Sequence, residues 1–270
     1  MKISAKTTFT AALLLAGGLA LTGCGGPAAS PATGGASSSE SAKQAAPSGP
    51  LTEDNFIDRI SAAQLDAGTV HLSMNMGDSV DGSVESDQEF STDPQKTRMH
   101  MTMSASGVDS EIILVDGKLF MNLGAMSQNK FIDMSADPAS AASVDAMIDQ
   151  VNPETQLAGF RAALTEFVAN PSTTTIDGVE TTQLTLTLDT KRMFEASMPE
   201  DMPVDSLIET LGESVVYEMF IGPDDLPRRI VMPNTAGLGT ATQEYTKWGE
   251  PVSIEAPAAD QIIDPAKLQG

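Results

Sequence analysis

The chain has 270 residues, and its 15 Lys and Arg residues against 37 Asp and Glu residues give a formal net charge of −22. This acidic balance argues against nucleic acid as a partner, because phosphate binding needs clustered basic side chains. The chain has one cysteine, so its folded part has no internal disulfide and must be stabilised by an apolar core.

Residues 1–23 have the pattern of a lipoprotein signal peptide. Lys2 and Lys6 precede an uncharged apolar run at 9–21, whose 13 residues are too few to span a bilayer core of roughly 30 Å. The run ends in LTGC, which resembles the bacterial lipobox and implies a diacylglycerol on the thiol of Cys24. We therefore expect export and a membrane anchor at Cys24. The alternative is an ordinary secretion signal with an unmodified cysteine.

Residues 24–50 are expected to form a lipidated cysteine followed by a disordered tether. Gly, Pro, Ser and Ala fill 22 of the 26 positions after Cys24, and none is a large apolar residue. Such a segment buries too little surface to offset the entropy cost of ordering it. The alternative is a poorly ordered terminus with no spacer role.

Residues 51–270 are long enough for one domain with a sizeable core. Apolar and polar residues alternate with a period of two in several segments, which is typical of strands with one buried face. Asp-Gly pairs at 81–82, 116–117 and 177–178 predict tight hairpins between such segments. The expected strands are 69–77, 98–103, 111–115, 183–188, 214–221 and 229–232.

Helical spacing interrupts this pattern in a few places. Residues 52–66 begin with a threonine that can cap a helix and repeat apolar residues at helical spacing. Helices are also expected at 138–151, 154–169 and 204–211. The order of one helix, about six strands, two helices and about five strands predicts an α+β fold. In it, a curved antiparallel sheet of about 11 strands packs against helices.

Methionine is unusually frequent, with 15 residues against one Trp and two Tyr. An unbranched, polarizable side chain adapts to irregular apolar shapes, so a methionine-lined face suits a deformable cavity for hydrocarbon. The alternative is an ordinary core in which Met replaces Leu or Ile. The candidate cavity residues are Leu72, Met74, Met76, Met99, Met101, Met103, Leu184, Leu186 and Leu188.

The sequence offers little support for catalysis. It contains no HExxH, GxSxG, Walker A or CxxC motif. His71 and His100 are the two histidines, and both alternate with apolar neighbours, so each is expected on the strand face opposite the methionines. We therefore expect no enzyme activity, no catalytic residues, no cofactor and no metal site; a hydrolase was the least favoured alternative.

Three further segments complete a family resemblance. Besides the lipobox, the tether and the hairpin strands, the sequence contains "IDGVETTQLTLTLD" at 176–189, "IGPDDLPRRIVM" at 221–232 and "EPVSIEAP" at 250–257. Together they resemble the LppX/LprAFG family of actinobacterial lipoproteins. The resemblance implies a LolA-like half-barrel with helices on its concave side and a cavity for the acyl chains of a lipid or lipoglycan.

Two functional hypotheses follow. The first is a lipoprotein, anchored outside the cytoplasm of an actinobacterium-like cell, that carries a lipid or lipoglycan through the envelope. Its partners would be the membrane, that ligand and an envelope transporter, and its body would be monomeric. The alternative is an envelope sensor or protein-interaction module of the same fold with no lipid cargo.

Overall fold

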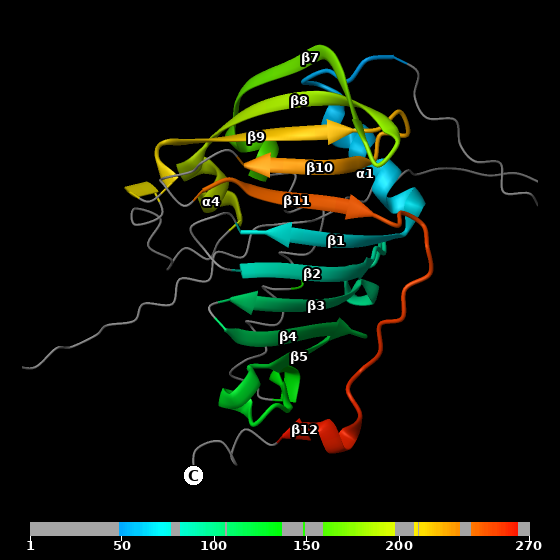
Figure 1. Cartoon of the computed structure of the whole chain (residues 1–270), viewed down its shortest axis with the longest axis vertical. Coiled ribbons are helices and arrows are strands. Elements are labelled where there is room, and N and C mark those ends of the chain that lie inside the picture. Colours follow the sequence, from blue (N-terminus) through cyan, green and yellow to red (C-terminus); the bar gives the residue numbers. More distant parts are fainter. Residues whose placement is uncertain are drawn as a thin grey trace, which may run out of the picture.

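The fold is built on one open sheet of 12 strands in the order β12-β6-β5-β4-β3-β2-β1-β11-β10-β9-β8-β7 (Figure 1). A computed structural model describes residues 49–76, 82–105, 107–136, 148, 159–197, 208–209, 211–232 and 239–263. Neighbouring strands are antiparallel except β12 and β6, which run parallel. The predicted α+β fold with a curved sheet is confirmed, and the sheet is mixed rather than purely antiparallel.

The chain forms this sheet in two meanders that meet in its middle. The first contains β1 (Thr69–Asn75), β2 (Gly82–Glu89), β3 (Arg98–Ala105), β4 (Val108–Val115), β5 (Lys118–Asn122) and β6 (Phe131–Asp133). The second contains β7 (Leu164–Ile176), β8 (Val179–Asp189), β9 (Ser214–Ile221), β10 (Pro227–Met232) and β11 (Ala241–Thr246). β11 returns to pair with β1, and β12 (Ile262–Ile263) then pairs with β6 at the far edge.

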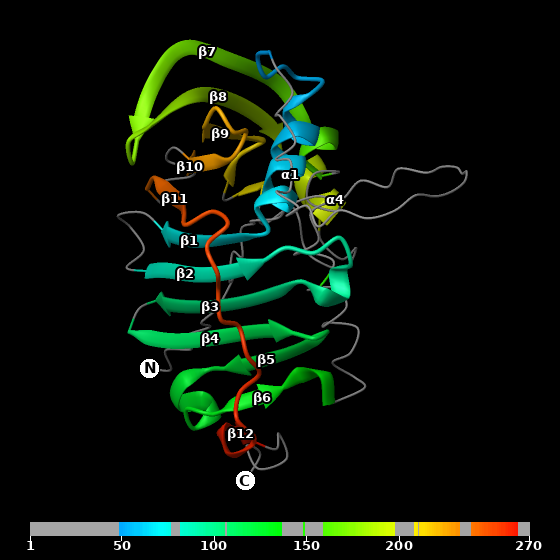
Figure 2. The ribbon, with the colours of Figure 1, turned by 90° about the vertical axis from the view of Figure 1, so that its right-hand side faces the viewer.

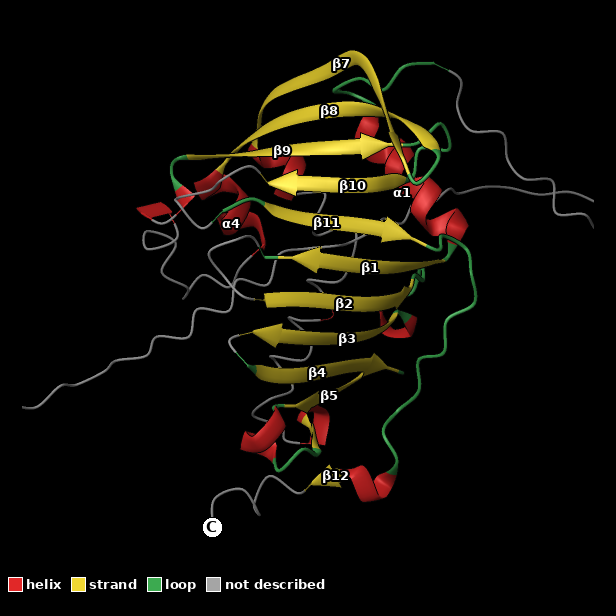
Figure 3. Cartoon of the chain, viewed as in Figure 1, coloured by secondary structure: helices red, strands yellow, loops and turns green. Residues whose placement is uncertain are grey.

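Helices lie mainly beside the second meander (Figure 3). The longest in the described parts of the chain are α1 (Phe56–Ala67) and α4 (Thr190–Ser197), and residues 159–163 are helical as well. Short 3-10 turns lie at Pro94–Lys96, Gly124–Ser127, Met134–Ala136 and Ala259–Gln261. Figure 2 shows α1 and α4 on the same side, with β7 and β8 arching beside them. None of the described helices is long and apolar enough to cross a membrane.

Two of the predicted Asp-Gly hairpins lie within the described residues. Asp116 and Gly117 join β4 to β5, with φ angles of 50° and 70°. Asp177 and Gly178 join β7 to β8, with φ angles of 49° and 80°. Two consecutive residues with positive φ match the twist of antiparallel strands, which explains why Asp-Gly marks these turns.

The first predicted helix is confirmed, although it begins at Phe56 rather than at residue 52. It buries Phe56, Ile57 and Ile60 against the sheet. It ends where Gly68 adopts a φ of 77° and donates its backbone N–H to the carbonyl of Gln64. This left-handed residue reverses the chain directly into β1.

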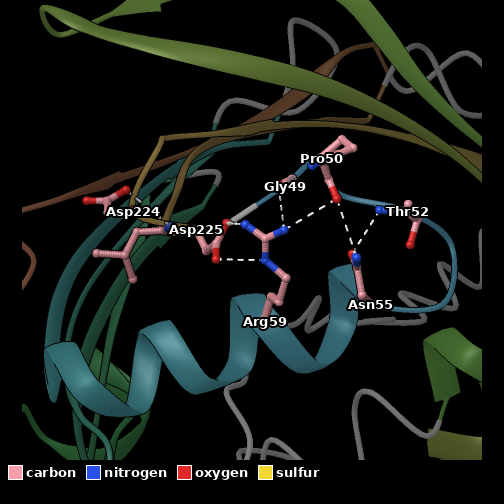
Figure 4. A network of polar contacts seen from close by, with 8 residues as sticks. Gly49, Pro50, Thr52, Asn55, Arg59, Asp224 and Asp225 are labelled. Atoms are coloured by element: carbon pink, nitrogen blue, oxygen red, sulfur yellow. Dashed lines mark hydrogen bonds and ion pairs between the residues drawn. The ribbon is translucent and has the colours of Figure 1, made fainter. Parts of the chain in front are cut away.

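A largely buried arginine, Arg59, joins this helix to the turn between β9 and β10 (Figure 4). Arg59 Nε and Nη2 donate to the two carboxylate oxygens of Asp225 at 2.9 and 2.7 Å. Arg59 Nη1 donates to the backbone oxygens of Gly49 and Pro50 at 2.8 and 3.3 Å. The same side chain therefore fixes α1, the hairpin turn and the start of the described chain.

The predicted helix at 154–169 is wrong in its second half, because β7 begins at Leu164. Two irregularities in its pairing with β8, at Leu164/Glu166 and at Ala169/Thr173, insert extra residues. Half-buried side chains consequently recur at Leu164, Phe167 and Asn170. A spacing of three resembles one turn of a helix, so the bulges explain the error.

The other predicted helices are described only in part. The helix at 138–151 lies outside the described residues except for Ile148, which is helical and buried. Residues 208, 209 and 211 are helical, inside the predicted helix at 204–211. The helix α4 was not predicted from the sequence.

Candidate functional site

The sheet brings the predicted cavity residues onto one face, which we call the inner face. Directly opposed residues form a continuous row across seven strands from β3 to β8: Met103, Val84, Met74, Gln243, Ile230, Met219 and Leu184. Side chains alternate along each strand, so the same face also carries Leu72, Met99, Met101, Leu186 and Leu188. Met76 follows β1 by one residue and continues the alternation.

The part of the inner face formed by the second meander is filled. Leu184, Leu186 and Leu188 have no solvent exposure. They belong to a core cluster with Phe56 and Ile60 of α1. These leucines, predicted as cavity candidates, are therefore packed core residues.

The part formed by β1, β3, β4 and β5 is more open. Met99 is buried in a cluster with Leu114 and Ile148, and Met101 packs against that cluster while half-buried. Met74, Met76 and Met103 are half-buried as well, and so is Met121 on β5. Met74 packs at the edge of the filled cluster. We call Met74, Met76, Met101 and Met103, which lie on or next to β1 and β3, the methionine patch.

Three buried polar residues interrupt this apolar face. Ser86 and Gln88 point inward from β2, and Gln243 points inward from β11. Ser86 lies directly between Leu72 of β1 and Met101 of β3. Its Oγ is one of two buried side-chain oxygens, with Thr190 Oγ1, that have no hydrogen-bond partner where the chain is described.

Two tyrosines also belong to the inner face. Burial raises the pKa of Tyr217 and of Tyr245 well above the ordinary value of 10.0, and the neighbouring Tyr217 raises that of Tyr245 further. Tyr217 Oη lies 3.7 Å from the sulfur of Met193 in α4. Both phenols therefore stay neutral at physiological pH and add apolar surface to this face.

The two histidines lie on the opposite, outer face, as predicted. His71 lies 2.7 Å from Asp87 Oδ1 through Nδ1 and 3.2 Å from Glu85 through Nε2. His100 Nε2 lies 2.7 Å from Glu111 Oε1. Within the described ranges, no three His, Cys, Asp or Glu side chains are arranged to hold a metal ion.

A hollow of about 340 Å³ also opens on the outer face. Its centre is a row of directly opposed residues from β2 to β5, namely Glu85, Thr102, Glu111 and Asn122. Met103 is the one large apolar residue beside the hollow, although the alternation along β3 directs its side chain to the inner face. This polar surface does not suit an acyl chain.

Sequence reasoning missed several members of the inner face: Ile112, Leu114, Leu119, Met121, Tyr217, Met219 and Tyr245. The run EIILV at 111–115 predicted a strand but did not show which residues point inward. Its outer residues Ile113 and Val115 are also apolar, because Val252 and Ile254 of the C-terminal segment cover them. The alternation is therefore hidden where both faces are buried.

The fold belongs to the class of curved, largely antiparallel sheets lined by helices, and solved structures with such a fold are similar to the chain. LprF from Mycobacterium bovis superposes with a TM-score of 0.50 at 16% identity, over 77% of this chain and 97% of that one. The lipoprotein LppX of Mycobacterium tuberculosis gives 0.45 at 16% identity, over 76% and 100%. The likeness to LprF confirms the predicted resemblance to the LppX/LprAFG family at the level of fold. No protein-family model and no curated protein matches the sequence.

Proposed function

We propose that this protein is a lipoprotein anchored outside the cytoplasm through Cys24 that binds the acyl chains of a lipid or lipoglycan and carries them through the cell envelope. The observation that carries the proposal is the methionine patch on a largely apolar inner face. Exposing one CH₂ group of an acyl chain to water costs about 0.8 kcal/mol. A deformable apolar face offsets that cost while keeping binding reversible.

The fold likeness to LprF supports this proposal, and the predicted lipobox supports the location. The tether at 24–50 would hold the body away from the headgroups, and an envelope transporter would supply or accept the ligand. We propose no catalytic step. The inner face binds, and neither histidine lies on it.

The alternative is a sensor or protein-interaction module without lipid cargo. The fully buried leucines of β8 favour it, because that half of the inner face has no space left for a ligand. The polar hollow on the outer face would then be a candidate contact surface.

Native mass spectrometry distinguishes the two functions. We expect the mature chain, residues 24–270 with Cys24→Ala, to co-purify with lipid from an actinobacterial host. Met101→Gln adds a polar group to the methionine patch and should reduce the lipid-bound fraction several-fold. The matched control is Thr102→Gln, which changes the adjacent residue on the outer face.

The control should retain the wild-type lipid-bound fraction. Lipid-free protein that also fails to take up a fluorescent acyl lipid would refute lipid carriage and favour the interaction module.

A further inference from the structure

We propose that Ser86 is a hydrogen-bonding subsite that selects an uncharged lipid with an ester carbonyl in its acyl region. The inference rests on the proposed function and narrows the class of ligand. Ser86 is 3% exposed, and its hydroxyl points into the inner face without a partner.

A buried hydroxyl without a partner is unusual, because buried polar groups almost always form hydrogen bonds. The residues opposite Ser86 are Leu72 and Met101, and neither side chain can accept a strong hydrogen bond. Alanine would fill the same space without the cost of burying an unpaired oxygen. The hydroxyl therefore suits a ligand that brings its own acceptor.

The surroundings of Ser86 show how a ligand would reach it. Met101 lies directly beside it on β3 and is half-buried. Methionine has three rotatable bonds, so this side chain can move aside more readily than a branched one. An acyl chain lying across the methionine patch would then place its ester group against Ser86 Oγ.

The inner face also indicates that the ligand's polar group carries no charge. The inward residues of β1 to β5, β9 and β11 include no Lys, Arg, Asp or Glu in the described parts of the chain. A carboxylate buried beside Ser86 would find no cationic side chain on these strands to pair with. An ester carbonyl, in contrast, needs only a donor, and a serine hydroxyl supplies one. A free fatty acid is therefore the disfavoured ligand.

Three probes with the same pyrene label and chain length test the subsite: a hydrocarbon, a methyl ester and a free acid. Fluorescence titration uses the mature chain, residues 24–270 with Cys24→Ala. We expect the ester to bind about fivefold more tightly than the hydrocarbon, as one net hydrogen bond would give, and the acid to bind most weakly. Ser86→Ala should remove the preference for the ester and leave the hydrocarbon affinity unchanged.

Two further variants serve as controls. Ser86→Thr keeps a hydroxyl and should keep the preference for the ester. Thr190→Val removes the other unpaired buried hydroxyl, which lies at the start of α4, and should leave the preference intact. Binding of all three probes with a ratio unaffected by Ser86→Ala would overturn the subsite alone. Failure of every probe to bind would overturn the proposed function as well.

Discussion

Single residues on the inner face differ in role according to what covers them. Leu186 of β8 and Met101 of β3 both point inward, but Leu186 is fully buried in a cluster that includes α1 residues, while Met101 stays half-buried. Tyr217 lies with Leu186, directly opposite it on β9. Its buried phenol couples the stability of the core to pH.

The first prediction concerns Tyr217 at alkaline pH. Its pKa is raised in the folded state, so its contribution to stability is complete below pH 10 and is lost as pH rises above that value. Above pH 10, the free energy of unfolding should fall by about 1.4 kcal/mol per pH unit for each such tyrosine. In urea unfolding between pH 8 and 11, the free energy of unfolding should fall less steeply with pH for Tyr217→Phe than for the wild type. Equal slopes would contradict the assignment.

At the scale of elements, α1 is attached to the sheet by an apolar face and by one polar contact. Phe56, Ile57 and Ile60 supply the apolar face. Arg59 supplies the polar contact, and its side chain and that of Asp225 are 12% and 5% exposed. A charge left alone at this depth would be costly, so the pair fixes the position of the helix over the filled half of the sheet.

The second prediction compares two arginine–aspartate pairs that involve α1. Arg59→Ala leaves Asp225 buried without its partner and should lower the free energy of unfolding by about 3–5 kcal/mol. Arg161→Ala removes a contact of 2.6 Å to Asp58, but both side chains are more than half exposed, so the loss should be about 0–1 kcal/mol. Chemical denaturation measures both. Similar losses would show that burial does not decide the strength of these pairs.

At the scale of the whole molecule, pairing of β1 with β11 joins two meanders that are far apart in sequence. The C-terminal segment then runs past the lower strands to β12 (Figures 1 and 2), and Ile254 packs on the outer face. We propose that the N-terminal side is tethered to a membrane. Arg59 holds Gly49 and Pro50, the point from which such a tether would leave the body.

The third prediction tests this anchor. Cys24→Ala in the full-length chain removes the thiol that would receive the lipid, so the protein should leave the membrane fraction or remain unprocessed. Cell fractionation and the intact mass of the product measure this. Ser38→Ala, in the proposed tether, is the control and should behave as wild type. Unchanged membrane retention and mass in Cys24→Ala would refute lipidation at this residue.

The sequence by itself determined which residues share a face in the strands with clear alternation, and where the hairpins turn. The alternation in TVHLSMN and RMHMTM placed Met74 and Met101 on one side and His71 and His100 on the other, because side chains alternate with a fixed period of two. Asp-Gly pairs marked turns through positive φ alone. These features depend on neighbouring residues only.

Only the tertiary structure decided how each part of that face is covered. Leu184 is fully buried in the core cluster that includes α1 residues, whereas Met103 is half-buried. Ser86 lies on a strand between theirs and is buried without a hydrogen-bond partner. β7 replaced the end of a predicted helix because bulged pairing with β8 gives a spacing of three. Covering elements and strand partners come from distant segments, so local periodicity does not encode them.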